Sequence, residues 1–145
     1  MGTVSAASRA FFERYARGRT ARDVELIAYQ YSDSFMFADP NGARVVEKAV
    51  LLATWPKGFE FLRSQGHQYT KLTSFNETRL DEHYLLVRAL FVWHFEKPSE
   101  QPIDIEVDSS FIVYAHQGAF TIVFQQEHEH FQETLRSRGI LPRAP

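Results

Sequence analysis

Apolar positions recur at helical spacing near the start of the chain. One face of the predicted first helix carries Val4, Ala7, Phe11, Phe12 and Tyr15, and charged residues occupy the opposite face. Gly18 is expected to end this helix. A second helix is predicted directly after it, because four apolar residues again share one face: Val24, Ile27, Ala28 and Tyr31.

A short strand and a third helix are predicted next. The run from Phe35 to Asp39 is too short for a helix and is bracketed by turn-forming residues, which predicts a strand. Apolar residues return at helical spacing from Val45 to Ala53, which predicts the third helix. Pro56 is expected to end or kink that helix, with a short continuation before Gly66.

The second half of the chain changes to a period of two, which is typical of strands. In the strand that begins at Ile103 the alternation is strict, so one face is apolar and the other carries carboxylates. In the strand from Tyr84 to Glu96 both faces are largely apolar, which indicates cover on both sides. A last short helix is predicted from about Glu129 to Arg138. The predicted strands are Tyr69–Arg79, Tyr84–Glu96, Ile103–Tyr114 and Phe120–Gln126.

This order of elements predicts an α+β fold, in which N-terminal helices pack in the concave face of a strongly curved antiparallel sheet. The length of 145 residues suits one domain spanning 1–145. A chain of this size buries roughly 68–70% of the surface that its unfolded form exposes. The 13 Phe, 6 Tyr and 2 Trp residues supply large rigid walls for a core, a pocket or an interface. A small apolar or aromatic ligand is therefore expected.

Charge and composition exclude several classes of partner and chemistry. The net charge of −2, with scattered basic residues, offers no footprint for nucleic acid or an anionic membrane. The absence of Cys excludes disulfides and thiolate nucleophiles, and no charged N-terminal region precedes a long apolar segment. A cytoplasmic protein without a membrane span is therefore expected. Because the sequence has no phosphate-binding glycine loop and no dinucleotide fingerprint, no cofactor is expected.

Asp39 and Tyr15 are the candidate catalytic residues. Asp39 stands at a predicted strand end, before Pro40-Asn41-Gly42. At the mouth of an apolar pocket, desolvation raises the pKa of a carboxylate and makes it a better general base. The alternative is an acid that only caps the turn. Tyr15 lies on the buried face of the first helix, so its hydroxyl either faces a pocket or meets a backbone carbonyl in the core.

The predicted strand from Tyr84 to Glu96 carries further candidate ligand-binding residues. Arg88 and His94 share one of its faces. If that face lines the cavity, Arg88 can clamp an anion and His94 can shuttle a proton; if it meets a partner subunit, both make interface contacts. On the other face, Trp93 and Phe91 form either a pocket wall or plain core. Because one helical layer covers only one face, a homodimer through the other is expected.

The segment His128-Glu129-His130 is a weak candidate for a metal site. It lacks the helical spacing of a His-Glu-x-x-His motif, and two histidines at an extended strand end supply only two ligands. No metal is therefore expected.

The element order, the strand that ends in acid-Pro-x-Gly after two helices, and the closing run Phe120-Thr121-Ile122-Val123-Phe124 together resemble the NTF2-like superfamily. That superfamily includes nuclear transport factor 2, ketosteroid isomerases, SnoaL-type polyketide cyclases and scytalone dehydratases. The resemblance covers nearly the whole chain and implies a cone-shaped α+β fold with an interior pocket.

Ketosteroid isomerases offer the nearest functional parallel. The resemblance implies that Asp39 is the general base and Tyr15 the oxyanion donor, on a mostly apolar substrate in an isomerase, cyclase or dehydratase reaction without cofactor. The second oxyanion donor maps to Asp108, Ser109 or Ser110, and Phe35 and Phe111 are expected to line the pocket. Ser109 shares its face with Val107 and Phe111, whereas Asp108 alternates with solvent-facing acids. A ligand-binding protein without turnover and a dimeric interaction module are the alternatives.

Overall fold

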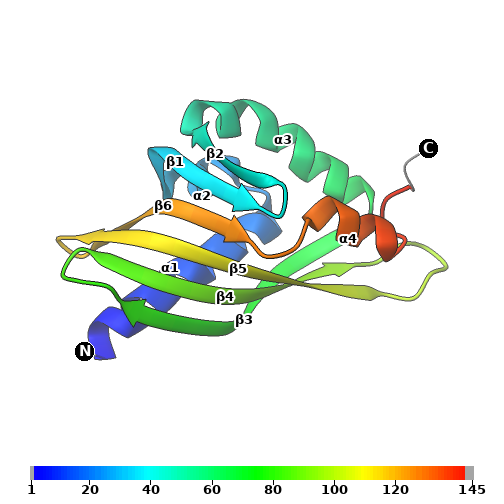
Figure 1. The fold of residues 1–145 in the computed structure, drawn as a ribbon. Helices are drawn as coiled ribbons and strands as arrows, with labels where there is room; N and C mark the ends of the chain where they lie inside the picture. The colour runs from blue at the N-terminus through cyan, green and yellow to red at the C-terminus, as the bar shows by residue number, and fades with distance from the viewer. Residues whose placement is uncertain (1, 143–145) are drawn as a thin grey trace.

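The computed structural model describes residues 2–142, with side chains described from Ala6 onward, so the side chain of Val4 lies outside the described part. The sheet has the strand order β2-β1-β6-β5-β4-β3 (Figure 1). In chain order the elements are α1 (Gly2–Ala21), α2 (Val24–Tyr29), β1 (Tyr31–Asp39), β2 (Gly42–Glu47), α3 (Lys48–Ser64), β3 (His67–Arg79), β4 (Tyr84–Phe95), β5 (Ile103–His116), β6 (Ala119–Glu127) and α4 (Phe131–Ser137).

The curved sheet has helices on its inner face, as the sequence predicts, but it is mixed and not wholly antiparallel. Strands β3 to β6 form an antiparallel meander, and β1 pairs with β2 antiparallel. Strand β1 pairs with β6 in parallel, with Tyr31 opposite Ile122. The sequence pattern of β1 carries no information about which strand it joins or in which direction. In Figure 1 the β1–β2 hairpin stands above β6 and below α3, so the sheet curls at this edge.

Residues Gly42–Glu47 form β2, so the prediction that the third helix begins at Val45 is wrong. The turn at Pro40 and Asn41 closes a hairpin in which Asp39 pairs with Gly42, and Gly42 has a φ of +133° that other residues rarely adopt. The β-branched side chain of Val45 suits an extended backbone. Helix α3 therefore begins only at Lys48.

Two helices continue past residues that were candidates to end them. Helix α3 runs through Pro56 to Ser64, so Pro56 does not end it, and the predicted continuation before Gly66 belongs to the same helix. Helix α1 continues past Gly18 to Ala21. Gly18 lies instead where α2 crosses, because a Cβ there would stand 2.8 Å from Cγ1 of Ile27. The absent side chain thus allows close helix packing.

The two faces of β4 have different environments. Its inward side chains are buried against the helices: Leu85, Val87, Ala89, Phe91, Trp93 and Phe95. From α1, Phe12 packs on Phe111 of β5, with ring centroids 4.7 Å apart. The opposite face of β4 is more open, and Leu86 on it is 39% exposed. The predicted concave packing of the helices is confirmed.

None of the helices within residues 2–142 has both the length and the apolar character needed to cross a bilayer.

Candidate functional site: a polar chain in an aromatic cavity

A cavity of about 490 Å³ lies between the inner face of the sheet and the helices α3 and α4. This volume falls within the range of small-molecule sites. Most of its lining is apolar. The aromatic side chains of the lining are Tyr15, Phe35, Phe37, Trp55, Phe59, Phe61, Phe91, Trp93 and Phe131.

Arg19 and Tyr15 form one polar end of the lining. They stand one helical turn apart on α1, so their side chains share a face. Arg19 Nη2 donates a hydrogen bond to the Tyr15 hydroxyl oxygen at 2.6 Å. Only 8% of Arg19 is exposed. Its guanidinium carbon lies 4.7 Å from the ring centroid of Tyr15 and 4.6 Å from that of Trp55, so aromatic rings surround the cation.

Tyr31 and Gln125 carry the polar chain across from α1 to β6. The hydroxyl oxygens of Tyr31 and Tyr15 are 3.3 Å apart, and the Tyr31 hydroxyl donates to Oε1 of Gln125. Burial, together with Tyr15, raises the pKa of Tyr31 well above its ordinary value, so Tyr31 stays neutral. Gln125 Nε2 then donates to Oε1 of Glu127 at 2.6 Å.

Glu127 ends the chain on β6, directly opposite Ser109 on β5. The Ser109 hydroxyl donates to the two carboxylate oxygens at 2.9 and 2.7 Å. Burial raises the pKa of Glu127, although the hydrogen bonds from Ser109 and Gln125 and the charge of Arg19 oppose this. A carboxyl group whose pKa is raised toward neutrality is well suited to general acid–base chemistry.

The Tyr15 hydroxyl has a proton to offer. Its oxygen accepts from Arg19, and the proton of Tyr31 is used in the bond to Gln125. The long 3.3 Å contact with Tyr31 is a weak alternative for the Tyr15 proton. Tyr15 can therefore donate to an oxygen of a bound molecule, while Arg19 supports the charge that develops there.

A β-bulge explains why Glu127 and Gln125 face the cavity. Phe124 pairs with Ile112, but the next pair joins Ile122 to Val113, which leaves Val123 as an extra residue in β6. The inward set of β6 therefore changes from even to odd positions at this point. Simple alternation from Ile122 would place Gln125 and Glu127 on the outer face, so the sequence pattern does not identify them as cavity residues. At the other end of the polar chain, the sequence does contain a signal: Arg19 follows Tyr15 by four residues, which places both side chains on one face of a helix.

Asp39 lies outside the cavity lining, so the expectation that it shares a cavity with Tyr15 is wrong. Its Oδ1 accepts the backbone N–H of Asn41 at 2.8 Å, and Oδ2 lies 3.6 Å from a guanidinium nitrogen of Arg44. An acid before Pro-Asn-Gly is used by the turn itself. The structural alternative considered for Asp39 describes its contacts.

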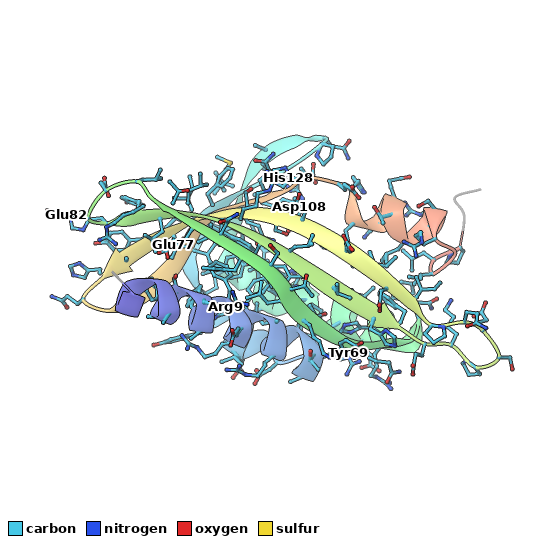
Figure 2. The ribbon with its side chains drawn as sticks, turned by 90° about the horizontal axis from the view of Figure 1, so that it is seen from below. Arg9, Tyr69, Glu77, Glu82, Asp108 and His128 are labelled. Carbon is cyan, nitrogen blue, oxygen red and sulfur yellow. The ribbon has the colours of Figure 1, made fainter. Side chains whose placement is uncertain are left out.

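Three predicted ligand-binding residues face away from the cavity. Arg88 donates to both oxygens of Asp108, at 3.0 and 2.6 Å, across the outer face of β4 and β5. His94 Nδ1 lies 2.6 Å from Asp104 on the same face. The alternative in which these residues bind a ligand in the cavity is therefore wrong, because the even positions of β4 and β5 point outward, as the alternation of Asp108 with solvent-facing acids indicates. Figure 2 shows Asp108 beside His128, whose Nε2 lies 2.7 Å from the Ser110 hydroxyl.

The other predicted pocket residues are mostly at the cavity. Phe35, Phe91, Trp93 and Ser109 line it, as expected. Phe111 does not: it is fully buried behind the wall, with its ring centroid 5.6 Å from that of Tyr15. Of the three positions considered for the second oxyanion donor, only Ser109 reaches the cavity.

The histidines after β6 have structural contacts. The His130 side chain caps α4, where Nδ1 accepts the N–H of Glu133 at 3.5 Å. Within residues 2–142, no group of three or more His, Asp or Glu side chains is arranged to hold a metal ion.

Comparison with known proteins supports the fold. No protein-family profile and no curated protein sequence matches the chain. Among solved structures, Aln2 from a Streptomyces species is 11% identical with a TM-score of 0.74, and the match covers 95% of this chain and 98% of that one. An NTF-2 like protein of unknown function from Shewanella oneidensis is 12% identical with a TM-score of 0.68, covering 86% and 98%.

A third structure, an NTF2-like protein of unknown function from Prochlorococcus, is 16% identical with a TM-score of 0.60, and the match covers 86% of this chain and 91% of that one. Helices packed on a curved six-stranded mixed sheet define an α+β cone. The chain has the NTF2-like fold, as the resemblance in its sequence predicts.

Proposed function

We propose that the cavity binds a mostly apolar small molecule and transfers a proton on it, with Glu127 as the acid–base group and Tyr15 as the hydrogen-bond donor. The observation that carries this proposal is the hydrogen-bonded chain from Arg19 to Glu127 along an otherwise aromatic wall. Proton transfer next to a carbonyl is also the chemistry expected from the resemblance to ketosteroid isomerases and polyketide cyclases.

The proposed step uses the two ends of the chain differently. The Glu127 carboxylate takes a proton from a carbon beside a substrate carbonyl, and the electron pair of that C–H bond moves toward the carbonyl oxygen. Tyr15, supported by Arg19, donates a hydrogen bond to the oxygen as it gains charge. Where a carbon–carbon double bond adjoins that carbon, the enolate is conjugated with it, and Glu127 returns the proton to the far carbon of the double bond, which moves next to the carbonyl. The net result is isomerisation, or the first stage of a cyclisation or dehydration, without a cofactor.

Paired variants test the proposal. Enolisable ketones, polyketide-like aldols and dehydratable alcohols are screened with the full chain, and any substrate found is assayed with Glu127→Gln and Asp39→Asn. We expect Glu127→Gln to lose at least about 100-fold in kcat, as is typical when a general base is removed. Asp39→Asn, which changes a carboxylate outside the lining, should stay within about twofold of the wild type. The opposite ranking would overturn the assignment of Glu127.

We also propose a homodimer through the outer face of the sheet. Leu86 and Tyr84 on this face of β4 are 39% and 37% exposed. Leu90 and Val92 are partly buried beside them. Apolar side chains grouped on an uncovered sheet face are typical of an interface. The ion pair of Arg88 with Asp108 would lie within this interface, where the two side chains neutralise each other's charge.

A further inference from the structure

The proposed proton transfer leaves most of the hydrogen-bond donors of Arg19 unused. Nη2 donates to the Tyr15 hydroxyl, but Nε is buried and has no hydrogen-bond partner among residues 2–142. No carboxylate in this part of the chain lies within ion-pair distance of Arg19. A buried guanidinium is ordinarily paired, because an uncompensated buried charge is strongly destabilising. An anion is the missing partner.

The groups that surround the Arg19 guanidinium are aromatic rings, and Glu127 acts on its charge only from beyond ion-pair distance. The rings of Tyr15, Trp55, Phe59 and Trp93 lie 4.6 to 5.9 Å from the guanidinium carbon. Aromatic faces attract a cation but accept no conventional hydrogen bond from its N–H groups. Since Arg19 lines the cavity, a molecule in the cavity can contact its side chain, and a small shift of the guanidinium would bring its free N–H groups to that molecule.

The charges of the lining also favour an anion. Among the described lining residues, Arg19 and Arg44 are the cations and Glu127 is the acid. Burial raises the pKa of Glu127 above its ordinary value, and Ser109 and Gln125 donate hydrogen bonds to its carboxylate. Arg44 is 60% exposed, and its guanidinium lies 3.6 Å from the carboxylate of Asp39, which compensates its charge. Arg19 is therefore the cation of the described lining that has no ion-pair partner, and it is set among apolar walls.

We infer that the ligand of the cavity is an aromatic or polycyclic carboxylate, whose carboxylate group pairs with Arg19 while its ring system lies among the aromatic side chains. This inference rests on the proposed function in taking the cavity as the ligand site. The fork of guanidinium N–H groups matches a carboxylate in geometry.

Three probes with one ring system test the charge preference in the full wild-type chain: 9-anthracenecarboxylate, 9-anthracenemethanol and 9-(aminomethyl)anthracene. The two Trp residues of the chain, Trp55 and Trp93, both line the cavity, so quenching of their fluorescence reports binding there. We expect the carboxylate to bind at least tenfold more tightly than the alcohol, and the ammonium probe to bind most weakly. Isothermal titration provides a second measurement.

Two Arg variants test whether Arg19 is the residue that causes the preference for the carboxylate probe. Arg19→Gln should reduce the affinity for the carboxylate to that for the alcohol, with circular dichroism as the check on folding. Arg17→Gln, which removes the same charge from the exposed side of the same helix, should leave the ratio unchanged. If Arg19→Gln does not fold, Arg19→Lys keeps the charge but loses the fork, and should lower the ratio without abolishing it.

The outcomes separate this inference from the proposed function. Equal or tighter binding of the alcohol, with quenching of the tryptophans, would overturn the carboxylate assignment and leave an apolar-ligand cavity in place. An unchanged preference in Arg19→Gln or in Arg19→Lys would also overturn it. No binding of any probe up to millimolar concentration would overturn both the carboxylate assignment and the proposed binding site.

Discussion

Ser109 and Glu127 face each other across β5 and β6, and the single hydroxyl of Ser109 lies within 2.9 Å of both carboxylate oxygens. This contact sits where the antiparallel register and the bulge at Val123 bring two polar side chains to the inner face. It holds the carboxylate in one orientation toward the cavity, and it lowers the pKa that burial raises.

Removing this hydroxyl should move the titration of Glu127. In Ser109→Ala the carboxylate loses a hydrogen bond that favours its charged form, so the pKa of Glu127 should rise further. The acidic limb of a pH–rate profile, or the carboxyl NMR titration of the ligand-free protein, should shift to higher pH. Ser110→Ala on the outer face is the matched control and should leave the titration in place. A downward shift in Ser109→Ala would contradict the contact.

Glu127 should make the protein less stable as the pH rises. Its pKa in the folded state lies above the ordinary value of 4.5, so the folded state binds more protons than the unfolded state between these two values. The free energy of unfolding should therefore decrease as the pH rises from about 4.5 through the folded pKa, and Glu127→Gln should remove this decrease. Urea denaturation at a series of pH values measures it. An identical pH dependence in both proteins would refute the raised pKa.

His67 should act in the opposite direction. Burial lowers the pKa of its imidazole from 6.5 to about 4, with a further contribution from Arg22. The unfolded state therefore binds more protons in this range, and acidification from pH 6.5 to 4 should cost about 3 kcal/mol of stability. His67→Gln should lose less stability than the wild type. The comparison is cleanest in a Glu127→Gln background, with exposed His116→Gln as the control.

Tyr15→Phe should affect both stability and turnover. The variant deprives buried Arg19 of its hydrogen-bond acceptor, which should cost about 1–3 kcal/mol in the free energy of unfolding. If the cavity is catalytic, loss of an oxyanion donor should lower kcat about 100- to 1,000-fold. Chemical denaturation and steady-state kinetics measure the two effects. Tyr29→Phe on α2, at a residue that is 85% exposed, should change neither.

The dimer proposal predicts a concentration-dependent assembly. Sedimentation at micromolar concentration should give a dimer for the wild type and a monomer for Leu86→Asp, because a carboxylate buried in the outer-face interface is unfavourable. Leu80→Asp, in the turn between β3 and β4, introduces the same charge at another exposed apolar residue and should remain dimeric. A wild-type monomer would show that Leu86 and Tyr84 have no partner on this face.

The sequence predicts the architecture well because the periodicities are strong. The helical stripe with Tyr15 and the two-residue period of β4 and β5 determine which side chains enter the core, and the buried odd positions of β4 confirm the assignment. The same period of two predicts that Ser109 faces inward, and it lines the cavity. The role of Asp39 could not be predicted in this way. An acid at the end of a strand has the same sequence pattern whether its carboxylate caps a turn or lines a pocket.

The position of Glu127 in the site depends on how the strands pair with one another. A bulge is a property of two paired strands, so nothing in β6 alone shows that alternation changes at Val123 and turns Glu127 inward. The pairing of β1 with β6, which brings Tyr31 to Gln125, likewise joins segments far apart in the chain. The periodicity of a single segment therefore predicts neither the bulge nor this strand pairing.

The extra residue in β6 means that strand length, as well as residue type, decides the character of this cavity. With a regular register continued from Ile122, Phe124 and Gln126 would face inward and Glu127 would face solvent. A single insertion or deletion can thus exchange an acidic wall for an aromatic one without replacing any side chain. Proteins of this architecture can therefore diverge in chemistry through a change of one residue in strand length, while the cone around the cavity stays the same.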